Sequence, residues 1–233
     1  MIFSRKKAAA AVEEPLEPVE ALAEPADDDP GDQERSQDLV DQWVEFDRSA
    51  DWRDDGPFDI SEVDLGADEI DRLDFGALIV TPESGMAIRL VVDARSNEIR
   101  QMIIENGPRS AMQLTLLAAP SREDYRAQIR QELIDDTHNA KAVQLAEGPF
   151  GTELRRVVTI TDERDKQALG QMRDWLIAGP RWVLNVRLVD KAALDLANDG
   201  AAAPLVEVVR NLVIRRGDVA MAPGTIIPLT PVS

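Results

Sequence analysis

The sequence predicts an α+β protein in which helices pack on a mainly antiparallel sheet, preceded by an acidic arm of about 70 residues that is largely disordered. Two observations predict this class. The charge of the chain changes abruptly near residue 74, and beyond that point several apolar β-type runs follow one another before the first helix pattern. The predicted parts are a disordered acidic tether over 1–33, an acidic segment with a short amphipathic helix over 34–74, and a single domain over 75–233.

The net charge of −18 lies almost entirely in the arm. Residues 1–74 hold 24 of the 44 Asp and Glu residues but only 7 of the 26 Lys and Arg residues. Because such a segment repels phosphate, we expect no general binding to nucleic acid.

Cysteine is absent, which excludes disulfides, thiolate metal sites and cysteine nucleophiles. No apolar run approaches the roughly 20 residues that span a bilayer. We therefore expect a cytoplasmic protein without a membrane span.

Within the arm, residues 8–33 are mostly Ala, Glu, Pro and Asp, too few of them bulky to offset the entropy of ordering. Residues 34–60 differ, because Leu39, Val40, Trp43 and Val44 share one face of a short helix and Trp52 follows. This helix either docks on its own domain or binds a partner protein, with the acidic residues raising the association rate and the aromatic residues supplying affinity.

The domain begins with four predicted strands, separated by turn signals, whose short loops imply antiparallel neighbours. They are 77–81, 86–93, 98–105 and 112–118. Partial alternation in the second of these strands predicts that only one of its faces is covered.

A helix is expected next, begun by a capping box of Ser121 and Asp124 and carrying an apolar stripe that includes Tyr125. Two strands, 142–146 and 153–161, should follow. A second helix is predicted from Asp162 to Ile177, with Leu169, Met172 and Leu176 facing inward.

The rest of the domain should contain a strand over 181–189 and a third helix from Pro204 to about Asn211. Residues 212–215 either continue that helix or form an edge strand, and residues 221–233 should be extended.

The sequence contains no pattern typical of catalytic residues, and it predicts neither a metal site nor a cofactor site. Phosphate-loop and nucleophile-elbow patterns are missing, and the single histidine, His138, has no serine placed to partner it. Adjacent carboxylates such as Asp135 and Asp136 point in different directions on a helix, so they do not form a catalytic pair.

Arg122, Arg126 and Arg130 form a stripe on the first helix at i, i+4 and i+8. They are either a solvated face or, together with Arg155-Arg156 and Arg215-Arg216, a basic patch that docks an acidic segment. The protein's own arm is one such segment, and its docking would act as an electrostatic inhibition that salt relieves.

Five segments together resemble, in this order, the actinobacterial family known as domain of unknown function 3710. They are Gly56-Pro57-Phe58-Asp59-Ile60-Ser61-Glu62, Leu73-Asp74-Phe75-Gly76-Ala77-Leu78, Gly148-Pro149-Phe150-Gly151-Thr152-Glu153-Leu154, Gly179-Pro180-Arg181-Trp182-Val183-Leu184 and Met221-Ala222-Pro223-Gly224. The chain departs from the family pattern at Tyr125, where tryptophan is expected, and at His138-Asn139, where paired glycines are expected.

The resemblance implies an actinobacterial cytoplasmic protein and transfers no catalytic residue. The order of elements also resembles the PsbP-like α-β-α sandwich, a fold used mainly for binding. In Gly179-Pro180-Arg181-Trp182, we expect Trp182 to enter a strand and be buried and Arg181 to face the other way, where it either has a structural role or binds a ligand.

The function best supported by the sequence is a non-enzymatic binding or assembly module that an acidic arm regulates, with an unidentified protein partner and homo-oligomerisation left open. The alternatives are a small-molecule-binding protein with a pocket between sheet and helices and, third, an enzyme. Candidate binding residues are Arg181, Trp182, Tyr125, Arg122, Arg126, Arg130, Trp43 and Trp52.

Overall fold

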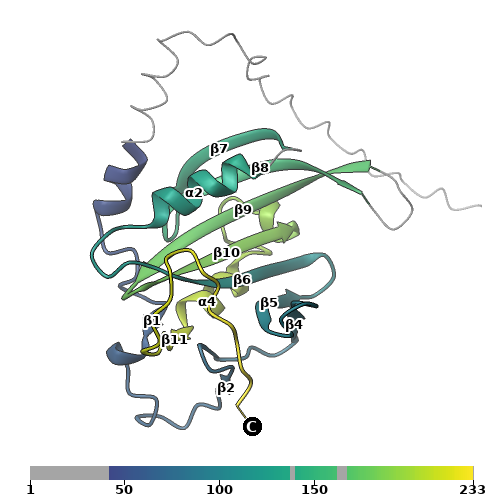
Figure 1. Cartoon of the computed structure of the whole chain (residues 1–233). Coiled ribbons are helices and arrows are strands. Elements are labelled where there is room, and N and C mark those ends of the chain that lie inside the picture. The colour runs from purple at the N-terminus through teal and green to yellow at the C-terminus, as the bar shows by residue number, and fades with distance from the viewer. Residues whose placement is uncertain (1–41, 137–139, 162–166, 233) are drawn as a thin grey trace, which may run out of the picture.

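A computed structural model describes residues 42–136, 140–161 and 167–232 of the chain (Figure 1). One group of strands forms a large sheet: β4 (Met86–Val92), β5 (Ile99–Asn106), β6 (Ser110–Ala118), β7 (Ala140–Gly148), β8 (Gly151–Thr161), β9 (Gln167–Gly179) and β10 (Trp182–Asp190). Their spatial order is β4-β5-β6-β10-β9-β8-β7, with every neighbouring pair antiparallel.

A second, smaller sheet contains β1 (Phe58–Asp59), β2 (Leu73–Asp74), β3 (Leu78–Val80) and β11 (Val213–Ile214) in the order β1-β11-β3-β2. The helices are η1 (Ile60–Glu62), α2 (Arg126–Asp135), α3 (Lys191–Leu194) and α4 (Ala203–Arg210), and residues 42–48 are also helical. The expected α+β class with a mainly antiparallel sheet is thus confirmed.

Both faces of the large sheet are covered over its central strands. The main core, which includes the fully buried Trp175 and Trp182, lies between one face and the layer of α3, α4 and the small sheet. On the opposite face, Ile129 of α2 packs against Leu176 and Val183. Figure 1 shows α2 over the half of the sheet that contains β8 and β9.

Four of the predicted elements agree with the structure at the start of the domain, but they divide between two sheets. β4, β5 and β6 form the expected meander, and alternate residues of β4 are exposed, as predicted for a strand covered on one face. The first predicted strand instead becomes β3, which pairs with β2 and β11. Residues 212–215 contribute β11, which lies inside the small sheet rather than at its edge.

The helix predicted from Asp162 to Ile177 is wrong. Asp162 lies outside the described residues, and Gln167–Gly179 is the strand β9, hydrogen-bonded to β8 and β10. Near its C-terminal end, successive side chains such as Trp175 and Leu176 are buried on opposite faces. A strand buried on both faces reads as a continuous apolar run, and period alone cannot separate such a run from a buried helix.

The capping box predicted at Ser121 is also wrong, because α2 begins only at Arg126. The Asp124 carboxylate accepts a bond of 3.1 Å from the Arg126 backbone N–H and is further bound by the Arg126 guanidinium. Because the Asp124 carboxylate binds Arg126, it does not reach back to the Ser121 backbone N–H as a capping box requires. The helix therefore starts five residues later than Ser121.

The chain after α4 completes the large sheet. β5 pairs with only part of β6, and residues 224–227 supply backbone bonds beside the remaining part, including Ile227 N to Leu116 O at 2.8 Å. Pro204 lies in the first turn of α4, as predicted, and this helix buries Leu205, Val206, Val208 and Val209.

Buried ion pairs flank β9 on its two faces. Arg173 and Glu153, both fully buried, are joined at 2.6 Å, and Trp175 also donates to that carboxylate. On the other face, the buried Asp174 accepts from Arg156 and from Arg187. Because unpaired charges are strongly disfavoured in an interior, these pairs fix which face each residue of β9 takes.

Glu153 makes stability depend on pH. Burial raises the pKa of Glu153, but hydrogen bonds from Arg173, Arg155 and Trp175 outweigh burial and hold its pKa below the ordinary value of 4.5. A lowered folded pKa contributes stability that is fully present above the ordinary pKa. That stability is lost as the pH falls through the folded value.

We predict that Glu153→Gln lowers the free energy of unfolding at pH 7 by about 3–5 kcal/mol, because Arg173 then lacks its carboxylate. The difference from wild type should shrink as the pH falls below 4.5, because the unfolded wild-type chain protonates Glu153 there before the folded protein does. Urea denaturation at a series of pH values measures both effects. The exposed Glu123→Gln is the control, and equal stability losses for the two variants would contradict the role of Glu153.

Candidate functional site

The most elaborate polar site joins the N-terminal segment to the domain. Residues 42–62, here called the docked segment, contain the helix 42–48, which lies beside α2 and the β7–β8 turn (Figure 1). Of the predicted apolar face, Trp43 and Val44 are half-buried, while Leu39 and Val40 lie outside the described residues. The structure therefore shows this helix on its own domain, the first of the two alternatives that the sequence left open.

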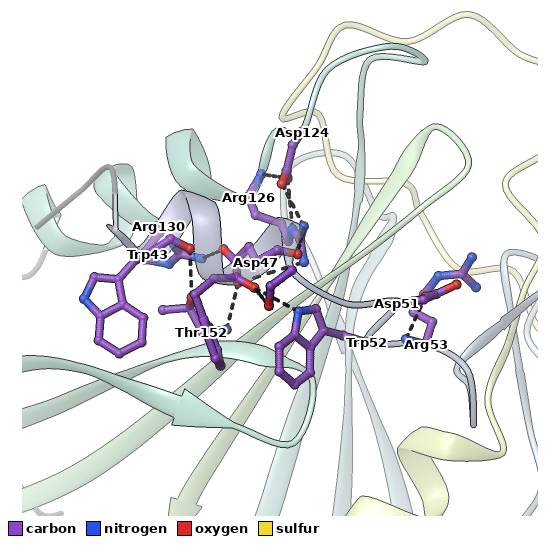
Figure 2. Close-up of polar contacts among 11 residues, drawn as sticks. Trp43, Asp47, Asp51, Trp52, Arg53, Asp124, Arg126, Arg130 and Thr152 are labelled. Carbon is purple, nitrogen blue, oxygen red and sulfur yellow. Dashed lines mark hydrogen bonds and ion pairs between the residues drawn. The ribbon is translucent and has the colours of Figure 1, made fainter. Parts of the chain in front are cut away.

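Asp47 is the centre of this contact, with only 3% of its surface exposed. Its carboxylate accepts from the Arg130 guanidinium and, at 2.8 Å, from the Thr152 backbone N–H. Arg126 donates to the Asp47 backbone oxygen at 3.0 Å (Figure 2). We call Arg126, Arg130 and Thr152 the cradle.

The β7–β8 turn lets the carboxylate approach closely. Gly151 has a φ of 97°, and a Cβ atom there would lie 2.8 Å from Asp47 Oδ1. The next residue, Thr152, donates its hydroxyl to the Trp43 backbone oxygen at 3.3 Å. Glycine is required at position 151 both for the backbone conformation and for the space.

Asp124 organises the arginine side of the cradle. It binds Arg126 through Nε at 2.9 Å and Nη2 at 2.7 Å. Burial raises the pKa of Asp124, but the bonds and the charge of Arg126 outweigh burial and lower its pKa overall. The guanidinium of Arg126 is thus held by one carboxylate while it reaches the docked segment.

Three aromatic rings continue along the docked segment. The Phe46 ring packs edge to face on Trp43, with ring centroids 5.7 Å apart. The same ring packs at a tilt on Trp52, with ring centroids 4.8 Å apart. All three side chains stay partly exposed. Figure 2 shows Trp43 and Trp52 on either side of Asp47. The result is a half-exposed aromatic surface, which we call the aromatic ladder, held in place by a buried carboxylate.

The far end of the docked segment is tied to the core. Arg53 binds Glu62 through two bonds of 2.9 Å and lies 5.4 Å from the centre of the Trp182 ring. Asp59 accepts from the Trp182 indole N–H at 2.9 Å. The segment is therefore anchored at both ends, by Asp47 and by Asp59.

The structure brings together four of the eight predicted binding residues: Trp43, Trp52, Arg126 and Arg130. Arg122 is exposed before α2, and Tyr125 precedes the first residue of that helix. Trp182 is fully buried.

Arg181 lies in the β9–β10 turn with a φ of 63° and donates to the Gly217 backbone oxygen at 2.7 Å. The other arginines proposed for the basic patch are engaged elsewhere: Arg155 with Glu153, Arg156 with Asp174, Arg215 with Asp74, and Arg216 with the backbone oxygens of Arg181 and Val219. His138 lies outside the described residues.

Sequence reasoning missed Asp47, Gly151 and Thr152. A usable signal for Asp47 was its position four residues after Trp43, which places a carboxylate on the apolar face of the helix. No local signal could select Thr152, because its backbone N–H faces a segment more than a hundred residues earlier in the chain.

A cavity of about 90 Å³ lies beside the docked segment, lined in part by Trp52, Arg53 and Arg126, and larger cavities lie elsewhere. One of about 450 Å³ lies between α2 and the outer face of β6 and β10, where the buried Asn185 Oδ1 has no hydrogen-bond partner. A larger one of about 690 Å³ lies beside the C-terminal segment. In the described ranges, no group of three His, Cys, Asp or Glu residues could hold a metal ion, and no helix is long and apolar enough to cross a membrane.

Comparison with family models gives a match over residues 56–232 to a family described as "Protein of unknown function (DUF3710)". Comparison with curated proteins gives no match. Among solved structures, the chain is similar to cyanobacterial PsbP (CyanoP) from Synechocystis sp. PCC 6803, with 6% identity and a TM-score of 0.35, covering 65% of this chain and 97% of that one.

We predict that Asp47→Ala lowers the free energy of unfolding by about 1–3 kcal/mol, the range for losing hydrogen bonds to charged groups. The cost should be smaller than for Glu153→Gln, because the segment can undock and expose Arg130 to water. Urea denaturation followed by tryptophan fluorescence measures it. The exposed Asp51→Ala, within about 0.5 kcal/mol of wild type, is the control. Identical midpoints for the two variants would rule out Asp47 as the anchor.

Proposed function

The chain belongs to the DUF3710 family, and we propose that it is a non-enzymatic binding module whose cradle recognises an acidic segment of a partner protein, with its own arm as the resident competitor. The observation that carries this proposal is the insertion of Asp47 between Arg126 and Arg130. It supports the proposal because the group that the cradle holds is a carboxylate on a short aromatic-bearing helix.

The docked segment is suited to be displaced. Its helical part is held mainly by one carboxylate, and Trp43, Val44 and Phe46 keep part of their surface in water. Undocking therefore sacrifices limited apolar burial, while the freed arginines gain hydration. A partner segment with a similar carboxylate and similar aromatic residues can offset that cost.

Charge gives the arm a regulatory effect. The arm carries most of the net charge of −18, so it keeps a high local concentration of carboxylates near the cradle. Salt weakens such attraction, because the screening length is about 10 Å at 0.1 M. Because the acidic arm repels phosphate groups, we infer that the partner is a protein rather than nucleic acid. A cytoplasmic location fits the cysteine-free composition.

A peptide copying residues 34–62 serves as a defined ligand for the full-length protein. We predict at least tenfold tighter binding to Asp47→Ala than to wild type, because the variant vacates the cradle. Fluorescence anisotropy measures the Kd.

Two matched controls follow. Asp47→Ala combined with Arg130→Gln, and the peptide carrying Ala at position 47, should each lose at least tenfold of that affinity. Equal affinity of the peptide for wild type and for Asp47→Ala would overturn the competitor role of the arm. Unchanged affinity in the double variant would overturn the cradle as the recognition site.

A second candidate function is small-molecule binding in the cavity between α2 and the sheet. The unbonded Asn185 Oδ1 favours it, since a buried acceptor without a partner calls for a donor. Glu132 and Asp136 also line this cavity, so an amine would suit it. Binding of such a ligand that Asn185→Ala abolishes and Arg130→Gln preserves would favour this candidate over the first.

A further inference from the structure

The cavity beside the C-terminal segment has the size and lining of a ligand site. Its volume of about 690 Å³ falls within the roughly 300–1,000 Å³ typical of ligand pockets. Much of the wall is apolar: Ala77, Val219, Met221, Ile226, Ile227 and Pro228.

The wall beneath the cavity is fixed by backbone bonds. Residues 224–229 are hydrogen-bonded to the ends of β6 and β5, including Gly224 N to Ala118 O at 2.8 Å and Leu229 N to Ile99 O at 2.8 Å. The shape of the cavity is therefore preformed by the same segment that completes the sheet.

One buried charged side chain in the wall, Arg216, lacks a carboxylate partner. Arg216 keeps only 9% of its surface exposed, and no carboxylate of the described residues lies within ion-pair distance of it. Its guanidinium donates from Nε to Arg181 O at 3.2 Å and from Nη1 to Val219 O at 3.0 Å. Nη2 donates to no group in the described part of the chain.

Arg216 differs from the other buried arginines of the described residues in lacking an ion pair. Within the described residues, Arg130, Arg156 and Arg173 are each paired with a buried carboxylate. Arg216 has no such partner, because the neighbouring Asp218 carboxylate pairs at 3.6 Å with Arg181 instead. Burial, followed by the Arg181 cation, outweighs the charge of Asp218 and lowers the pKa of Arg216. Two backbone carbonyls satisfy donors of Arg216 but do not neutralise its charge.

The second arginine of the cavity does not change this balance. Arg100 lies 3.5 Å from Glu98 and 3.5 Å from Asp93. Glu98 also lines the cavity and Asp93 does not, so among the lining residues the charge of Arg100 is cancelled by that of Glu98. Among the lining residues, the remaining charge is that of Arg216.

We propose that this cavity binds a small amphipathic anion, a carboxylate or phosphate monoester with an apolar body, whose anionic group pairs with Arg216. A guanidinium suits both anions, because its planar N–H groups match their oxygens. The apolar wall takes the remainder of the ligand and excludes water from the ion pair. This site is separate in its residues from the cradle, so the proposal does not depend on the function proposed above.

Octanoate, octyl phosphate, 1-octanol and inorganic phosphate are defined probes for the full-length protein, with isothermal titration calorimetry as the readout. We expect octanoate or octyl phosphate to bind at least tenfold more tightly than both 1-octanol and inorganic phosphate. Hydrogen exchange should show protection of residues 216–228 by the bound probe. Which anion binds better separates a carboxylate ligand from a phosphate ligand.

Three variants localise the binding. Arg216→Gln, which keeps side-chain donors but no charge, should lose at least tenfold in affinity. Val219 is 74% exposed at the cavity, so Val219→Glu should fold normally and weaken binding at least threefold, whereas the matched Val219→Lys should not weaken it. This pair decides the matter even if Arg216→Gln is unstable.

Three results would overturn the proposal. The first is equal binding of octanoate and 1-octanol, and the second is no binding of either amphipathic anion at millimolar concentration. The third is equal affinity of the Val219→Glu and Val219→Lys variants for the anion.

Discussion

The structure depends most on the paired charges that flank β9. Arg173 with Glu153 on one face, and Asp174 with Arg156 on the other, are buried in the large sheet, and the half-buried Arg187 also binds Asp174. A slip of one residue along this strand would bury each charge against apolar groups on the wrong face. These pairs therefore fix the register of β9 and, through it, the positions of β8 and β10.

The same chemistry attaches the N-terminal segment. Asp47 is buried because Arg130 and the Thr152 N–H meet it, as Glu153 is buried because Arg173 meets it. The difference lies in what happens when the pair breaks. Arg173 stays enclosed by the sheet and α3, whereas Arg130 can be rehydrated once the helix at residues 42–48 leaves. One kind of interaction thus holds a central strand and, in the function proposed above, a contact that a partner can displace.

Sequence patterns predict structure most reliably where one face of an element is exposed to solvent. β4 alternates, α4 carries a proline in its first turn, and the meander from β4 to β6 has turn signals between its strands, so all were predicted within a few residues. The prediction was wrong for β9, because burial on both faces removes the alternation that identifies a strand. At the candidate site the patterns selected Arg126, Arg130, Trp43 and Trp52 but not Asp47.

The sequence by itself determined the acidic arm, the α+β class and the family, because charge, local periodicity and short motifs are properties of neighbouring residues. Only the tertiary structure decided which charges meet. Asp47 lies 83 residues from Arg130, and Arg216 is notable because no carboxylate of the described residues forms an ion pair with it. The energy of a charge depends on its burial and partners, and those come from elements distant in the chain.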